Sequence, residues 1–308
     1  MILCITPNPA IDRTILLSKL LPGQVHRAQK VMIAAGGKGL NVARAIRVLG
    51  GQCLCMGFVG GHTGSLLSDL AAQEGLPTSW TQVENETRTC LILVSAGEDA
   101  TVVNEPGMPV GSAAWQQLRH DVKSALSSAS IACISGSLPL DSAPEDLQAL
   151  LDMLVETGKP VWIDTSGQSL RTALERPDLS IKVNGNEIGE VLGFEVRDAD
   201  SARRALHMLR GHGLRSAVIT LGSDGAVLAT RSGQWLAIGP RVPVVSTVGS
   251  GDAFLGGLVS ALDAGKPAPE ALGDAVAAGT ANALSAGGGQ FNLREFQQIR
   301  EQVRIENW

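Results

Sequence analysis

The stretch VPVVSTVGSGDAFLGGLVSAL, residues 242–262, combines strand, loop and helix signals in one run. Residues 242–245 are mostly β-branched, which predicts a short strand. Phe254, Leu258 and Leu262 recur at helical spacing, so a helix follows. Glycines lie between the two. A glycine loop that opens a helix presents unpaired backbone N–H groups with partial positive charge, and such groups bind phosphate.

Asp252 lies in the first turn of that helix. An acidic residue at this position can simply stabilise the helix start, or it can take a proton from a hydroxyl that attacks a phosphoryl group. The local pattern leaves both interpretations open. The loop lacks GxxxxGK[ST], and Phe254 takes the place of the third glycine of GxGxxG, so neither a Walker A loop nor a dinucleotide-binding loop is predicted.

A second glycine loop, AGGKGLNVAR at residues 35–44, follows a strand-like segment and opens a helix. It carries Lys38, a point positive charge, and Asn41, a hydrogen-bonding residue suited to hydroxyls. An ordinary helix start with a solvated lysine is the alternative. Upstream, Asp12 follows the first strand and could accept hydrogen bonds from two sugar hydroxyls, or could be a turn residue.

Short β-rich segments alternate with longer helical patterns along the chain. The predicted strands are 2–5, 53–59, 131–135, 161–164, 180–183 and 216–220, and the predicted helices include 40–49, 63–74, 114–126, 144–156 and 198–210. This alternation predicts an α/β fold with a mainly parallel sheet flanked by helices, in which ligands bind at the carboxyl ends of the strands.

Two segments, about 13–34 and 87–105, break the alternation because each holds two strand-like pieces and no helix. A turn at residues 97–99 separates the second pair. These strands are expected to form a small separate β-sheet, with surface hairpins of no particular role as the alternative. No linker divides the chain, so residues 1–308 are expected to be a single domain.

The composition excludes several classes of protein. Glycine accounts for 36 of 308 residues without a three-residue period, and apolar residues make up 44%, which excludes collagen and disorder. A net charge of −5 gives no basic surplus, so no nucleic-acid partner is expected. The longest uncharged stretch, residues 275–293, is too polar to cross a membrane, so no membrane span is expected. The five cysteines lack a CxxC pair and are expected to be buried reduced thiols of a cytoplasmic protein.

The two glycine loops, read as Gly36-Gly37-x-x-x-Asn41-x-Ala43 and Gly249-x-Gly251-Asp252, resemble the two motifs of the ribokinase-like (PfkB) sugar kinase family. The resemblance runs the full length of the chain. It extends, in the family's order, to Asn8-Pro9-x-x-Asp12, Thr87-Arg88, Ile134-Ser135-Gly136-Ser137-Leu138-Pro139, Asp164-x-Ser166-Gly167, Asn184-x-x-Glu187 and Leu221-Gly222-x-x-Gly225. Lys38 and residues 246–249 look like the branch of the family that acts on phosphosugars.

The resemblance implies a ribokinase-like fold with a small β-sheet lid, and transfer of a phosphoryl group from ATP, with Mg²⁺, to a hydroxyl of a phosphorylated ketohexose. Fructose 1-phosphate, giving fructose 1,6-bisphosphate, is the first expectation. Tagatose 6-phosphate and fructose 6-phosphate are alternatives, and an inactive sugar- or nucleotide-binding protein is a remote one that the intact second motif disfavours. The partners implied are a phosphosugar and ATP, and a homodimer paired through the lid is expected by analogy.

The resemblance also implies roles for individual residues. Asp252 would be the catalytic base, and Gly249, Ser250 and Gly251 would form an anion hole. The residues near the sugar would be Asp12, Gly36, Gly37 and Asn41, and those near its phosphate Arg27, Lys38, Arg88 and Ser137. The nucleotide would contact Lys182, Asn184, Thr220, Gly222, Gly225 and Asn282, and Glu187 with Asn184 would organise Mg²⁺ through water.

This sequence departs from the family's pattern at two positions. Val183 stands where the family commonly has Pro, which could shift the edge of the nucleotide site. Ser246 replaces an Asp found in many ribokinase relatives, and the phosphosugar branch often lacks that Asp. The second departure puts a monovalent-cation requirement in doubt.

Overall fold

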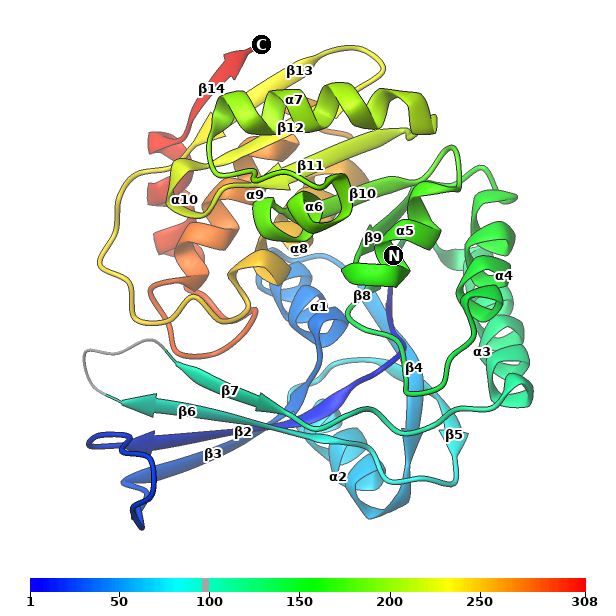
Figure 1. The fold of residues 1–308 in the computed structure, drawn as a ribbon, viewed down its shortest axis with the longest axis vertical. Helices are drawn as coiled ribbons and strands as arrows, with labels where there is room; N and C mark the ends of the chain where they lie inside the picture. Colours follow the sequence, from blue (N-terminus) through cyan, green and yellow to red (C-terminus); the bar gives the residue numbers. More distant parts are fainter. Residues whose placement is uncertain (96–99) are drawn as a thin grey trace.

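The computed structural model describes residues 1–95 and 100–308, and these form a large sheet and a small one (Figure 1). From edge to edge, the large sheet contains β14 (Arg304–Asn307), β13 (Gln234–Ile238), β12 (Ala226–Thr230), β11 (Ser216–Thr220), β10 (Ser180–Asn184), β9 (Val161–Asp164), β8 (Ile131–Ser135), β1 (Ile2–Thr6), β4 (Cys53–Gly60) and β5 (Thr78–Val83). Neighbours from β5 to β11 are parallel, and β12, β13 and β14 continue antiparallel. The predicted mainly parallel sheet is confirmed.

Helices cover both faces of the large sheet. One face carries α1 (Lys38–Val48), α8 (Ser250–Asp263) and α9 (Ala268–Asn282), with α10 (Leu293–Gln302) packed on α9. The other carries α3 (Ser112–Ala125), α4 (Pro144–Val155), α5 (Gly167–Leu174), α6 (Gly185–Leu192) and α7 (Ala199–Leu209). Helix α2 (Gly61–Gln73) lies beside β4, and single turns of 3₁₀ helix follow α3, α7 and β11: η1 (Leu126–Ser128), η2 (Arg210–His212) and η3 (Gly222–Asp224). The predicted segments match these elements to within two residues at each end.

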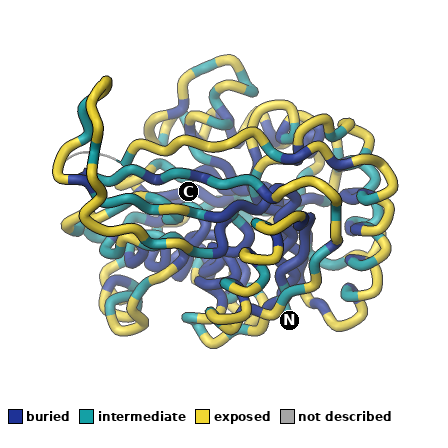
Figure 2. Tube along the Cα trace, turned by 90° about the horizontal axis from the view of Figure 1, so that it is seen from below, coloured by how far each residue is buried: buried dark blue, intermediate teal, exposed yellow. Residues whose placement is uncertain are grey.

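The strands are buried on both sides because their side chains alternate between two apolar layers. In β1, Ile2 and Cys4 pack into the layer under α1 and α8, while Leu3 and Ile5 pack into the opposite layer, and all four are fully buried. Figure 2 shows the central strands buried and the outer loops exposed. All five cysteines are buried and free, as expected.

The small sheet is separate from the large one, and we call it the lid. Its strands, in order, are β3 (Lys30–Gly36), β2 (Ala10–Leu17), β6 (Thr89–Ser95) and β7 (Thr101–Asn104). It projects to one side of the carboxyl ends of the large sheet (Figure 1). The predicted pairing of the two irregular segments is confirmed, whereas the turn expected at 97–99 lies outside the described residues.

The strand predicted at residues 242–245 is wrong, because the chain there is an irregular loop in which Val244 and Val245 are 60% and 62% exposed. The position beside β13, the preceding strand, is not open to these residues, because β14 already pairs there. Pro243 also lacks the N–H that a ladder requires. Within the described residues, no helix combines the length and hydropathy of a membrane span.

Candidate active site

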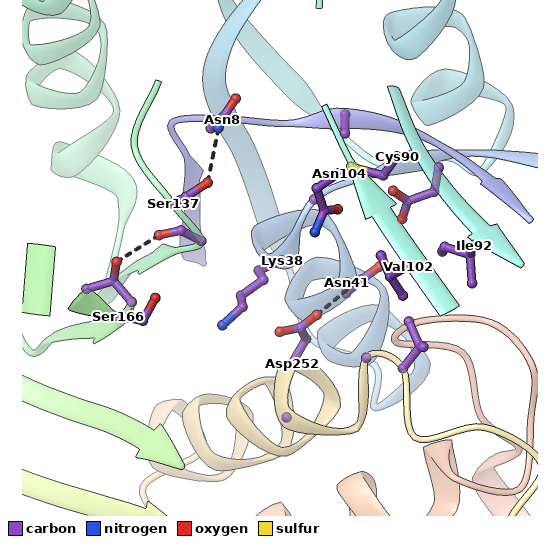
Figure 3. Close-up of a pocket in the computed structure, with 18 of the residues that line it drawn as sticks. Asn8, Lys38, Asn41, Cys90, Ile92, Val102, Asn104, Ser137, Ser166 and Asp252 are labelled. Carbon is purple, nitrogen blue, oxygen red and sulfur yellow. Dashed lines mark hydrogen bonds between the residues drawn. The ribbon is translucent and has the colours of Figure 1, made fainter. Parts of the chain in front are cut away.

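A cavity of about 450 Å³ lies where the carboxyl ends of the parallel strands meet the lid and the first turns of α1 and α8 (Figure 3). The lid contributes the alternate residues Asp12, Cys90, Ile92, Val102 and Asn104. Strand register explains this set, because Asp12 pairs with Cys90, and Cys90 pairs with Asn104, so their side chains share one face.

The structure brings most of the predicted site residues together around this cavity. Those that line it are Asp12, Gly37, Lys38, Asn41, Arg88, Ser137, Lys182, Asn184, Glu187, Gly249, Gly251 and Asp252. Gly36 and Ser250 adjoin the lining residues in sequence. At Gly36 a Cβ would come within 2.2 Å of the Asp12 carboxyl carbon, so only glycine leaves room for that carboxylate.

The loop before α8 needs glycine for a conformational and a packing reason. Gly249 is the N-cap residue and adopts the left-handed conformation with φ 77°. A Cβ there would also lie 2.4 Å from Cα of Gly288. This close packing lets α8 begin at the wall of the cavity, which Gly249 and Gly251 line. The unpaired N–H groups of its first turn can therefore bind an anion there.

Asp252 is buried in the first turn of α8, and its Oδ2 accepts a hydrogen bond of 2.8 Å from Nδ2 of Asn41 (Figure 3). Burial raises the pKa of Asp252 to about 6, although Lys38 and Lys182 act in the opposite direction. Near neutral pH the carboxylate is therefore charged and still close to its pKa, which suits a general base.

A fully buried carboxylate, Asp164 at the end of β9, holds two lysines of the cavity. Its Oδ1 lies 2.8 Å from Nζ of Lys38, and its Oδ2 lies 2.5 Å from Nζ of Lys182. Burial alone would raise the pKa of Asp164, but the two lysines outweigh it and hold the pKa below its usual value. Asp164, Asp252 and Glu187 together raise the pKa of Lys38 despite its burial. Asp164 and Lys38 therefore both remain charged.

Arg88 lies on the lid side of the cavity and is oriented by neutral partners. Its Nη1 and Nη2 donate to the carbonyls of Glu105 and Asn8, at 3.2 and 3.1 Å. Its Nε is buried without a hydrogen-bond partner among the described residues. Nearby, Nδ2 of Asn8 donates to Oγ of Ser137 at 3.0 Å. The guanidinium is fixed in place while its charge remains available for an anion.

Asn184 and Glu187 form a capping box at the start of α6. Oδ1 of Asn184 accepts a hydrogen bond from the backbone N–H of Glu187, and Oε2 of Glu187 accepts one from the backbone N–H of Asn184. The other oxygen, Oε1 of Glu187, faces the cavity 3.7 Å from Nζ of Lys38. The described residues hold no cluster of three or more acidic, His or Cys ligands. These groups fit Mg²⁺ bound mainly by phosphates and water, with one carboxylate nearby.

Besides Gly36 and Ser250, five predicted residues do not line the cavity. Arg27 is exposed on the loop between β2 and β3, because this hairpin extends beyond the site. Thr220 ends β11, the neighbour of β10, and Gly222 begins η3 just after it. At Gly225 a Cβ would lie 2.1 Å from the carbonyl oxygen of Ala237, so packing requires glycine there. Asn282 is fully buried and donates to the carbonyl of Val248 and to Ser250, so it braces the loop before α8.

Three features of the site carried no role in the sequence prediction. Asp164 belongs to the segment Asp164-x-Ser166-Gly167 that resembles the family, but only the fold shows that it pairs with Lys38 and Lys182. Gly288 and Gly289 pack against Asn41, where a Cβ would lie 2.8 Å from its Nδ2 and 2.1 Å from its carbonyl oxygen respectively. Arg44, one turn beyond Asn41, is buried and bonded to it. Of these three features, only the packing against Asn41 had a signal in the sequence, namely the run of glycines at 287–289.

Comparison with known proteins places this geometry in a family. The model of the pfkB family carbohydrate kinases matches residues 6–294. The chain is 36% identical over 264 residues to 1-phosphofructokinase of Xanthomonas campestris pv. campestris, covering 84% of this chain and 83% of the relative.

Two solved structures of phosphofructokinase-2 from Escherichia coli are also similar, each at 28% identity. The complex with fructose-6-phosphate has a TM-score of 0.88 and covers 97% of this chain and 98% of the other. The complex with potassium has a TM-score of 0.90 and covers 98% of each. With the two glycine loops, the flanked parallel sheet and the lid all present, the chain belongs to the pfkB family of carbohydrate kinases.

Proposed function

We propose that this carbohydrate kinase transfers the γ-phosphoryl group of ATP to a hydroxyl of fructose 1-phosphate. The observation that carries the proposal is the cavity itself: it is lined by a buried carboxylate at a glycine-opened helix start and by a lid arginine that, among the described residues, donates its printed hydrogen bonds to backbone carbonyls. The similarity to a 1-phosphofructokinase over most of both chains favours this substrate.

In this proposal Asp252 takes the proton of the attacking hydroxyl as its oxygen forms a bond to phosphorus and the bond to ADP breaks. The N–H groups of Gly249, Ser250 and Gly251 would stabilise the charge on the transferred group. Catalysis would rest on positioning and electrostatics, as is usual for phosphoryl transfer.

The sugar would lie between the lid and α1. Asp12 and Asn41 offer hydrogen-bonding groups to its hydroxyls, and Gly36 and Gly37 leave room for close approach. Arg88, Ser137 and Lys38 would hold the phosphate that the substrate already carries. Arg27 lies outside this cavity, and within one chain we propose no contact between it and the sugar.

ATP would extend from Lys182 and Asn184 along the ends of β10 and β11 toward Thr220, Gly222 and Gly225, with Asn282 supporting the loop below. Mg²⁺ would be held by the phosphates and by water molecules that Glu187 and Asn184 orient, and when bound it supplies positive charge to the phosphate oxygens. The chain's own contribution is to hold Glu187 in place through its bond to the N–H of Asn184.

The test is the rate of ADP release with fructose 1-phosphate, fructose 6-phosphate, tagatose 6-phosphate and unphosphorylated fructose. The highest kcat/KM is expected with fructose 1-phosphate. A preference for a 6-phosphate, as the fructose-6-phosphate complex of the E. coli relative would suggest, would overturn the proposed substrate but leave the proposed kinase activity intact. Absence of turnover with all four sugars would favour a binding protein instead.

Replacing Arg88 with Ala is expected to raise the KM for the phosphosugar by at least about 10-fold, because a charge-assisted contact contributes roughly 1.5–3 kcal/mol. The KM for ATP should change little. The matched control is Arg197→Ala, which removes an arginine that is 75% exposed and does not line the cavity. Equal rises in both KM values would contradict a substrate-phosphate role for Arg88.

We also propose that two chains pair through the outer face of the lid. The register places Val31, Ile33, Leu91 and Val103 on the face opposite the cavity. Val31, Ile33 and Val103 are 48%, 40% and 50% exposed, so an apolar surface is open to solvent on a thin sheet. Such surfaces commonly mark a protein interface.

In sedimentation velocity at micromolar concentration, a dimer is expected for the wild type and a monomer for Ile33→Asp. Leu66→Asp, at a similarly exposed apolar residue on α2, should leave the dimer intact. A monomeric wild type, or a dimer that tolerates Ile33→Asp, argues against pairing through the lid.

A further inference from the structure

Arg44 on α1 is buried below the cavity floor and is 6% exposed. Among the described residues its hydrogen bonds reach the cavity lining at Asn41, and its charge also counteracts the burial that raises the pKa of Asp12. Its guanidinium is bonded on every side that the described residues offer. Nη1 donates to Oδ1 of Asn41 at 2.7 Å, Nη2 donates to the carbonyl of Ala35, and Nε and Nη2 donate together to the carboxylate of Glu74. A charged side chain this deep needs such partners.

Arg44 determines how the amide of Asn41 is oriented. A guanidinium has only donors, so the amide atom that faces it must be the oxygen Oδ1. The NH₂ group must then point the other way, and there it donates to Oδ2 of Asp252 at 2.8 Å. If the amide were turned over, NH₂ would face the guanidinium and an oxygen would face the carboxylate, and both contacts would be repulsive.

Glu74 holds the guanidinium itself in place. It is the C-cap residue of α2, 25% exposed, and it binds Arg44 through both carboxylate oxygens. A bidentate pair fixes the plane of the guanidinium as well as its position. The Arg44–Glu74 pair therefore orients the hydrogen bond to Asn41. Because the pair is neutral overall, it adds little net charge to the site.

We propose that Arg44, fixed by Glu74, is a positioning residue for phosphoryl transfer: it sets the amide of Asn41, which in turn holds the Asp252 carboxylate toward the substrate hydroxyl. The proposal rests on the proposed role of Asp252 as the base. A series of linked hydrogen bonds thus supports catalysis, running from Glu74 through Arg44 and Asn41 to Asp252. Only Asn41 and Asp252 line the cavity.

The pH dependence of kcat separates positioning from mere structural support. The groups facing Asp252 are Lys38 and Asn41 from α1, Asp164 from β9 and Lys182 from β10. With its pKa raised to about 6, Asp252 gains a proton below that pH, so wild-type kcat should fall on the acid side near pH 6. The bond from Asn41 lowers that pKa, so losing the bond moves the acid limb to higher pH.

The decisive variant is Arg44→Lys, which keeps the charge but cannot donate to Glu74, Ala35 and Asn41 from one rigid plane. We expect kcat to fall by about 10- to 100-fold, as for a small misplacement of a catalytic group, and the acid limb to move to higher pH. Arg47→Lys, the same substitution one turn on at an exposed position of α1, is the matched control.

Glu74→Gln serves if Arg44→Lys does not fold, because Glu74 is partly exposed and the variant keeps its size. The limb should shift in the same direction, by less. In the background of Asn41→Ala, Arg44→Lys should change kcat little, because its effect passes through that amide. If Arg44→Lys and Glu74→Gln have the same kcat and the same acid limb of the pH profile as Arg47→Lys, the proposal is overturned.

Asp252→Asn distinguishes the two levels of failure. If Asp252→Asn keeps near-normal turnover, the base assignment fails and this inference fails with it. If Asp252→Asn is inactive while the Arg44 and Glu74 variants match their control, the proposed function stands and only the positioning role is rejected.

Discussion

Asp252→Asn is expected to lower kcat by roughly 10²- to 10⁴-fold, the range that a general base contributes. An amide of the same shape cannot take the proton of the attacking hydroxyl at neutral pH. The measurement is ADP release at saturating ATP and fructose 1-phosphate. The control is Asp263→Asn, the same change at the other end of α8, where the carboxylate lies 4.0 Å from the N-terminal amine and outside the cavity.

The fold should tolerate this substitution. Burial raises the pKa of Asp252 to about 6 from an ordinary value of 3.8, so the folded state holds a proton more tightly than the unfolded state does. The stability linked to that proton is present below pH 4 and is lost as the pH rises through about 6. At pH 7.5 the neutral Asn avoids the cost of a buried charge and should be no less stable than Asp in thermal melts.

Two results would contradict the assignment. Turnover of Asp252→Asn within about threefold of the wild type would remove Asp252 from the role of base. A variant that is inactive because it melts well below the wild type would show a structural role, and fluorescence of the five tryptophans reports that directly. The base assignment therefore requires loss of kcat with a retained melt.

Asp164→Asn is expected to lower the free energy of unfolding by about 3–5 kcal/mol, the usual cost of removing one partner from a buried ion pair. Asp164 is fully buried, and Lys182, only 4% exposed, would lose its carboxylate. Lys38 would lose its nearer acidic partner as well. Because both lysines line the cavity, a large loss of activity should accompany the loss of stability.

Urea unfolding at pH 7.5 measures this effect. The control is Asp178→Asn, which removes the carboxylate of an exposed pair with Arg231 and should cost about 0–1 kcal/mol. Since the pKa of Asp164 is lowered in the fold, its contribution is present above the ordinary Asp pKa and fades as the pH falls below about 4. The wild type and Asp164→Asn should therefore converge in acid. A difference below about 1 kcal/mol at pH 7.5 would mean that Asp164 does not support the two lysines.

The sequence predicted those parts of the site that depend on neighbouring residues. Asp252 follows a glycine loop at a helix start, and both the positive φ of Gly249 and the helix are consequences of residues within a few positions. The lid strands were also predicted, because their patterns break the alternation of strands and helices. At residues 242–245 the same local rules failed, since a strand needs a free sheet edge and β14 occupies the one beside β13.

What the sequence by itself determined is therefore the order of strands and helices, the two glycine loops and the identity of the residues at their ends. The tertiary structure alone decided which of them meet. Asp164 lies 126 residues from Lys38 and binds it, Arg44 is bound to a glutamate of the following helix, and Arg27 is carried away from the cavity by its hairpin. The physical reason is that periodicity and backbone preference act over a few residues, whereas these contacts depend on sheet order and on how α1, α2 and the lid pack.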